Sequence, residues 1–272
     1  MRNHSFLVLV LLLVVGVFGV DTDGVKSVSV MEGDSVTLLT GLTEIQTDEV
    51  LRWTIQDDTI IAETDGEDKA ISVPGNEESF QGRLKLDPKT GSLTITNIKT
   101  RDSGVYKLKI SGKKLAESEF SVTVRGVFSD DGVKKMSASK DESVTLQTRI
   151  IYKPEDDVIE WTFGSQDTAL AKTDRQNDKI IIIYNEDDVR FKDRLELKTQ
   201  SGDLTVNYFN TEVSGLYKVK IIKKTYTLQK TFDVGLKDSQ ERSGSTGTGV
   251  SVKCGASVVL ACAAAVLLLQ GV

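Results

Sequence analysis

Apolar and polar residues alternate one by one in short stretches along much of the chain. In residues 51–56, Leu51 and Trp53 lie on one side of the alternation and Arg52 on the other, and residues 105–110 follow the same rule. A period of two residues predicts β-strands with one buried face. Turn-forming sequences such as Pro-Lys-Thr-Gly separate these stretches. The pattern therefore predicts an all-β protein made of short strands.

The chain also repeats itself. The matching parts are 24–38 with 132–146, Trp53 with Trp161, and 103–110 with 214–221. Two homologous domains of about 100 residues each explain this repeat. Short strands separated by turns in each copy predict a β-sandwich. The expected fold class is all-β, with two tandem sandwiches.

The N-terminus predicts secretion. Arg2 precedes an apolar run over residues 6–17, and Val17 and Gly19 have the spacing of a signal peptidase site. The alternative, an uncleaved signal anchor, is disfavoured because the run is short for a membrane span. We expect the mature chain to begin near Asp21, outside the cytosol.

The C-terminal segment 254–272 is uncharged and apolar, and no basic stop-transfer cluster follows it. The small residues Ser243, Gly244 and Ser245 precede it, separated by the spacer 246–253. This order predicts a glycosylphosphatidylinositol anchor at the small triplet. The alternative is a transmembrane helix without a cytoplasmic domain, for which the segment is just long enough. In both cases the protein faces outward from the cell membrane.

These features divide the chain into five parts. They are a signal peptide (1–20), domain 1 (21–125), domain 2 (126–236), a Ser/Gly/Thr stalk with the anchor site (237–253), and the hydrophobic anchor segment (254–272). Both cysteines, Cys254 and Cys262, lie in the last part. The two domains are therefore expected to fold without a disulfide, although the extracellular compartment permits one.

Each domain resembles a variable-type domain of the immunoglobulin superfamily. The resemblance rests on a tryptophan in the third strand and a tyrosine in Asp-x-Gly-x-Tyr or its equivalent. These are Trp53 with Tyr106, and Trp161 with Tyr217. The family's two inter-sheet cysteines are replaced by Thr40 and Leu108 in domain 1, and by Thr148 and Val219 in domain 2. The packing of Leu38, Leu51, Trp53, Leu84, Leu93, Ile95 and Leu108 must then make up for the missing bridge.

A closer resemblance is to leukocyte adhesion receptors of the SLAM type and their lipid-anchored ligands. It rests on residues 83–95 and 106–110. The family pattern implies an ion pair between Arg83 and Asp102, whereas Val213 replaces the acid in domain 2. Domain 1 is thus expected to be the better-formed variable domain. The second domain departs from the subgroup because it is also cysteine-free and variable-like.

Composition excludes several chemistries. The one histidine, His4, lies in the signal peptide, so neither zinc sites nor His-dependent nucleophilic catalysis are expected. The net charge of −6 argues against nucleic acid or an anionic membrane surface as a partner. The acidic clusters 155–157 and 186–188 are interpreted as solvated loops, and a surface hydrolase is the weakest alternative. We expect no catalytic residue, no metal and no cofactor.

The remaining candidate is a protein-binding face. If Trp53 and the alternate residues of its strand are buried, then Arg52 and Thr54 point outward, and Lys107 and Lys109 do so on a neighbouring strand. The only N-glycosylation sequon lies in the signal peptide, so this expected basic patch is uncovered. The SLAM-type resemblance implies that the patch binds another immunoglobulin-superfamily protein, with homophilic binding included.

The sequence therefore indicates a cell-surface adhesion or recognition protein in leukocyte immune recognition. The alternative from another class is a single-pass receptor subunit that signals through an associated chain. Such subunits carry a charged residue within the membrane span, and the segment 254–272 has none.

Overall fold

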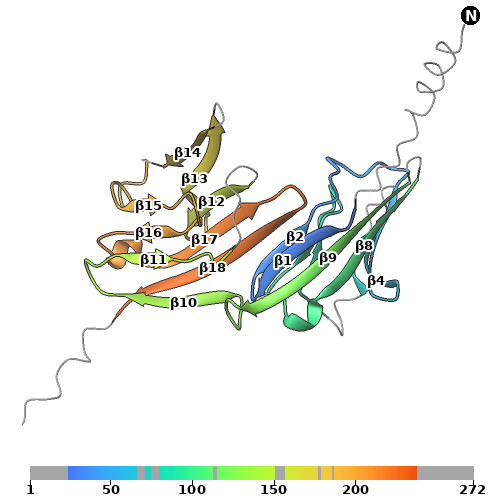
Figure 1. Ribbon diagram of the computed structural model, residues 1–272, viewed down its shortest axis with the longest axis horizontal. Helices are drawn as coiled ribbons and strands as arrows, with labels where there is room; N and C mark the ends of the chain where they lie inside the picture. Colours follow the sequence, from blue (N-terminus) through green and yellow to red (C-terminus); the bar gives the residue numbers. More distant parts are fainter. Residues whose placement is uncertain are drawn as a thin grey trace, which may run out of the picture. The chain divides into compact units, whose positions relative to one another are not determined.

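Figure 1 shows the computed structural model of the chain. It describes residues 24–65, 71–74, 80–112, 115–150, 157–176, 179–185 and 187–237. The expected signal peptide, the anchor triplet at 243–245 and the segment 254–272 lie outside the described residues. Within the described parts, no helix is long and apolar enough to cross a membrane.

The first sandwich has a front sheet and a back sheet. The front sheet has the strand order β1 (Lys26–Glu32), β9 (Ala116–Val127), β8 (Gly104–Ser111), β3 (Val50–Ile55), β4 (Thr59–Asp65) and β5 (Ile71–Ser72). The back sheet has the order β2 (Ser35–Leu38), β7 (Leu93–Ile95) and β6 (Leu84–Leu86). Strand β1 pairs in parallel with β9, and the other pairs within this sandwich are antiparallel.

The second sandwich repeats this arrangement. Its front strands are β10 (Val133–Ala138), β18 (Tyr226–Leu236), β17 (Gly215–Ile222), β12 (Val158–Phe163), β13 (Thr168–Gln176) and β14 (Lys179–Tyr184). Its back strands are β11 (Val144–Leu146), β16 (Leu204–Val206) and β15 (Leu195–Leu197). Short 3-10 helices, η2 (Thr100–Asp102) and η3 (Thr211–Val213), precede β8 and β17. The predicted fold class, all-β with two tandem sandwiches, is confirmed.

A tryptophan lies at the centre of each core. Trp53 is fully buried, and its ring centroid lies 5.4 Å from that of Phe120. Trp161 is buried in the same way, 5.6 Å from the ring of Phe232. The seven residues that the sequence assigns to the core of the first sandwich are all buried.

In each sandwich, the core tryptophan and the threonine at one of the family's two cysteine positions donate hydrogen bonds to the same turn. The Thr40 hydroxyl donates to the carbonyl of Thr90 (2.7 Å), and the Trp53 indole N–H donates to the carbonyl of Gly91 (2.9 Å). The second sandwich repeats both bonds, from Thr148 to Ser201 (2.7 Å) and from Trp161 to Gly202 (3.0 Å). The single bond from the threonine contributes about 0.5–1.5 kcal/mol, which is less than the roughly 2–5 kcal/mol that a lost native disulfide typically costs.

One tyrosine in each sandwich, Tyr106 or Tyr217, donates a hydrogen bond to the 3-10 helix that precedes its strand. The hydroxyl of Tyr106 donates to the carbonyl of Asp102 (2.7 Å), and Tyr217 makes the matching bond to Val213. Arg83 forms the expected bidentate ion pair with Asp102, with N–O distances of 2.6 and 3.0 Å. The charge-assisted fork fixes the connection between the sheets of the first sandwich.

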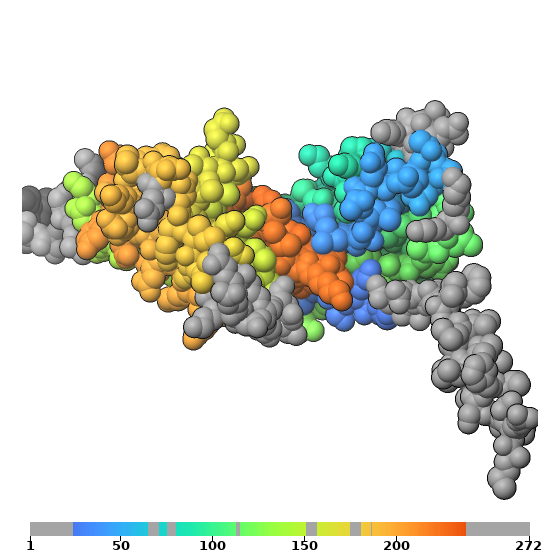
Figure 2. All heavy atoms as spheres, turned by 90° about the horizontal axis from the view of Figure 1, so that it is seen from above, coloured from blue at the N-terminus to red at the C-terminus, as the bar shows by residue number. Residues whose placement is uncertain are grey.

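The two sandwiches share a sheet, which the sequence does not predict. The beginning of β18 pairs antiparallel with β2, with Tyr226 opposite Leu38 and Gln229 opposite Ser35. The front sheet of the second sandwich thus continues into the back sheet of the first (Figure 1). In the space-filling view, orange atoms of the second sandwich meet blue atoms of the first (Figure 2).

A buried ion pair lies at this junction. The Lys230 Nζ atom is 2.5 Å from Oδ1 of Asp34, and both side chains have 0% exposure. The Lys230 ammonium also lies 4.3 Å from the ring centroid of Phe128, and Phe128 packs edge-on against Phe232. The described residues up to Lys237 belong to one compact unit.

Candidate functional site

The four residues predicted to form a binding face lie together on the front sheet of the first sandwich. Arg52 is opposite Lys109, and Thr54 is opposite Lys107, where β3 pairs with β8. All four line one shallow depression with a volume of about 410 Å³. They point outward because Leu51, Trp53 and the alternate residues of β8 fill the core.

Each of the three cations has an acidic partner. Arg52 Nε lies 2.8 Å from Glu63, Lys107 Nζ lies 3.1 Å from Asp58, and Lys109 Nζ lies 3.4 Å from Glu117. The face therefore carries both signs of charge in alternation, rather than the basic patch that the sequence suggests.

The acidic partners come from two places. Glu117 lies on β9 directly opposite Lys109, and Glu119 lies opposite Lys107. Asp58 lies in the turn between β3 and β4, with a φ angle of 61°. Its carboxylate accepts a hydrogen bond from Lys107 and thereby raises the pKa of that ammonium. The alternation of Glu117 and Glu119 along one strand is a sequence signal that could have identified these two acids.

The pairs are exposed and therefore weak. The Lys107 side chain is 40% exposed and that of Asp58 is 74% exposed. Such surface ion pairs contribute about 0–1 kcal/mol each. An incoming protein could replace them with its own charges at little cost, while Ile60, at 37% exposure, offers an apolar contact beside them.

The equivalent face of the second sandwich differs in charge. Lys218 and Lys220 on β17 correspond to Lys107 and Lys109, and Lys218 pairs with Asp167 at 2.7 Å. Glu160 on β12 stands where the first sandwich has Arg52. The second sandwich thus provides a matched comparison for experiments on the first.

The described residues contain no candidate metal site. No group of three or more His, Cys, Asp or Glu side chains could hold a metal ion there. Of the two acidic clusters, Asp157 pairs with Lys223, and Asp188 pairs with Arg190. Glu155, Asp156 and Glu186 lie outside the described residues.

Residues 24–125 match the family model described as the immunoglobulin V-set domain. This match covers the first sandwich, so the expected resemblance to the variable-type immunoglobulin domain is confirmed for that domain. The comparison with curated proteins gave no match.

Several solved immunoglobulin-type structures are similar to this chain. A crystal structure of CD84, solved for insight into SLAM family function, has 18% sequence identity and a TM-score of 0.33, over 38% of this chain and 96% of that chain. The first Ig-like domain of human CD48 antigen has 18% identity and a TM-score of 0.35, over 43% and 92%. The CD2-binding domain of CD58 has 16% identity and a TM-score of 0.32, over 76% and 96%.

Proposed function

We propose that this protein is a cell-surface adhesion or recognition protein that binds another immunoglobulin-type protein through the front sheet of its first sandwich. The observation that carries the proposal is the depression formed by Arg52, Thr54, Lys107 and Lys109 on a V-set domain. Arg52 and Lys109 are exposed, Thr54 and Lys107 are half-buried, and no N-glycosylation sequon occurs after residue 5.

The charges of this face suit reversible recognition. Exposed pairs add little stability to the free protein, so their exchange for intermolecular pairs costs little. Complementary charge increases association rate and specificity more than affinity. Because the face holds acids and bases side by side, a partner with the same alternation would fit, and the proposal includes a second copy of this chain as well as a different receptor.

The proposal places the protein on the extracellular side of the cell membrane, in leukocyte recognition. The support for membrane attachment is the order of small triplet, spacer and apolar segment at the C-terminus. We propose lipid attachment at Ser243, Gly244 or Ser245. A phosphatidylinositol-specific phospholipase should release the protein from intact cells. Full retention, with a C-terminal epitope still detectable after Val272, would instead favour the single-pass receptor subunit.

Charge reversal tests the binding face. Lys107→Glu with Lys109→Glu should abolish staining by the multimerised ectodomain of cells that display its partner. The matched control, Lys218→Glu with Lys220→Glu, changes the net charge equally on the second sandwich and should leave staining intact. Both variants should melt close to the native protein, because none of the four side chains lies in a core. Equal staining by both variants would refute the assignment of the face.

A further inference from the structure

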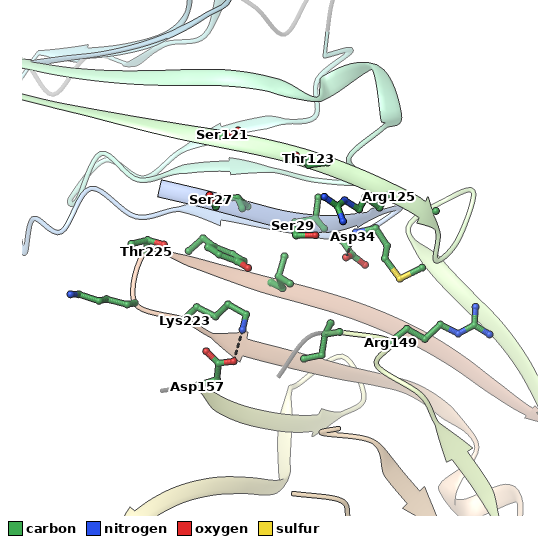
Figure 3. Close-up of a pocket in the computed structure, with 18 residues that line it drawn as sticks. Ser27, Ser29, Asp34, Ser121, Thr123, Arg125, Arg149, Asp157, Lys223 and Thr225 are labelled. Carbon is green, nitrogen blue, oxygen red and sulfur yellow. Dashed lines mark hydrogen bonds and ion pairs between the residues drawn. The ribbon is translucent and has the colours of Figure 1, made fainter. Parts of the chain in front are cut away.

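A second concave surface lies where the sandwiches meet, away from the face described above. It is a groove of about 1430 Å³ between the free edge of β1 and the beginning of β18. Figure 3 shows Ser27 and Ser29 along one side, and Lys223 with Asp157 along the other. The apolar parts of Tyr226 and Leu228 also line the groove.

The groove gathers positive charge in a protein whose net charge is −6. Arg125, Arg149 and Lys224 line it and are exposed, and none of them forms an ion pair with another described residue. Each of the two acids in the described lining already forms an ion pair with a lysine, Asp34 with Lys230 and Asp157 with Lys223. The described lining therefore has an excess of cations.

The electrostatic environment agrees with this excess. Burial lowers the pKa of Lys134, and the charge of Arg149 lowers it further. Burial also lowers the pKa of Lys230; Asp34 acts against this effect, while Lys134 and Arg149 add to it. Lys134, Arg149 and Lys230 thus lie close enough to repel one another. An anion beside Arg149 would relieve this repulsion.

The side of the groove formed by β1 and β9 carries four hydroxyl groups. On the parallel strands β1 and β9, Ser27 lies opposite Ser121, and Ser29 lies opposite Thr123. All four belong to the lining, because the alternate residues Val28 and Val122 are buried. Such hydroxyls both donate and accept hydrogen bonds, which matches the hydroxyl groups of a sugar.

We propose that this groove binds an acidic oligosaccharide, with sulfate or carboxylate groups on Arg125 and Arg149 and sugar hydroxyls on the serine and threonine rows. Guanidinium groups form bidentate bonds with such oxyanions. The cations come from separate elements, so a ligand with repeated negative charges fits better than a single ion. An acidic peptide fits less well, because the Tyr226 hydroxyl, whose pKa is raised by burial and lowered in part by the Ser29 backbone, lies at the free edge of β1, where an added strand would pair.

The test uses a sulfated hexasaccharide prepared from heparin and the soluble ectodomain, in a direct binding measurement by calorimetry. Arg125→Glu with Arg149→Glu should weaken binding at least about tenfold, because two charge-assisted contacts are lost. The variant Lys218→Glu with Lys220→Glu carries the same charge change on another face and should retain binding. Binding should also fall with rising salt concentration.

Three results would overturn the proposal. They are unchanged binding by the arginine variant, equal binding of an uncharged hexasaccharide, and equal binding of a polyglutamate peptide of the same charge. A melting curve checks that the arginine variant is folded, and Arg125→Gln with Arg149→Gln serves as a milder second variant. Lys107→Glu with Lys109→Glu should leave the hexasaccharide affinity unchanged, so this test is independent of the proposed function.

Discussion

Lys230→Met is the substitution that tests the junction between the sandwiches. The methionine keeps most of the side-chain volume but removes the ammonium group. Asp34, with 0% exposure, would then keep its carboxylate without a cation. Its remaining bond, from the Met31 amide at 2.9 Å, does not neutralise the charge.

The expected loss follows from the burial of the pair. Removing one partner of a buried ion pair costs about 3–5 kcal/mol, because the other charge stays buried and unpaired. In a unit of this size, 1 kcal/mol corresponds to about 2–4 °C in melting temperature. The substitution should therefore lower the melting temperature by roughly 6–20 °C. Adding Asp34→Asn removes the remaining charge and keeps an acceptor for Met31, so the double variant should recover part of the loss.

The loss should also depend on pH. Burial raises the pKa of Asp34 above its unfolded value, so this carboxyl stabilises the fold when protonated and less so as pH rises through its folded pKa. Without Lys230 the pKa rises further, because the ion pair is what lowers it. The difference between the variant and the native protein should therefore be smaller at pH 5 than at pH 8.

The assay is urea unfolding of the soluble ectodomain at both pH values. Lys107→Met is the control, because it breaks an exposed pair and should cost far less than Lys230→Met. If Lys230→Met costs as little as this control, or if its cost does not change with pH, then the pair is not buried and the shared sheet is refuted.

Three further substitutions or conditions test the fold itself. Gly91→Ala should lower the free energy of unfolding in urea more than Gly41→Ala does. Both glycines have a positive φ, 68° and 82°, so both substitutions strain the backbone. Only the new Cβ at Gly91 would lie 2.3 Å from a Leu51 methyl group, whereas Gly41 faces open space. A similar cost for both would contradict the packing. Tyr106→Phe should lose about 0.5–1.5 kcal/mol with its bond to Asp102, and no loss would place the hydroxyl in solvent. Reductant should leave the melting temperature unchanged, because neither sandwich contains cysteine; a drop of more than a few degrees would contradict this.

The alternation of apolar and polar residues predicts the strands and their buried faces well, because it follows directly from the geometry of a strand. The internal repeat predicts the two sandwiches. Leu51 and Trp53 are buried and Arg52 is exposed because successive residues of a strand point to opposite faces. The pairing of Arg83 with Asp102 follows from the family resemblance and is confirmed. The alternation of side chains along β3 and β8 also places Thr54, Lys107 and Lys109 on one face.

The shared sheet cannot be predicted in this way. Strands β2 and β18 pair through main-chain groups at their edges, and main-chain hydrogen bonds leave no pattern in the side chains. Lys230 occupies an inward position of its strand, yet a lysine among polar neighbours is usually exposed. Only the position of Asp34 across the junction explains its burial.

The mixed charge of the candidate face is missed for a related reason. Asp58 reaches Lys107 from a turn whose left-handed φ angle is not evident in the sequence. Glu63 meets Arg52 because β4 pairs in register with β3 up to a bulge after Trp53. Registers of this kind depend on turn geometry as well as on hydrophobic pattern.

The most direct measurement of the central claim is lysine footprinting of the ectodomain in complex with its partner. Acetylation followed by mass spectrometry reports which ammonium groups become inaccessible on binding. The account predicts strong protection of Lys107 and Lys109, with Lys218 and Lys220 modified as in the free protein. Protection of Lys218 and Lys220 alone, or unchanged modification of all four in a saturated complex, would contradict it.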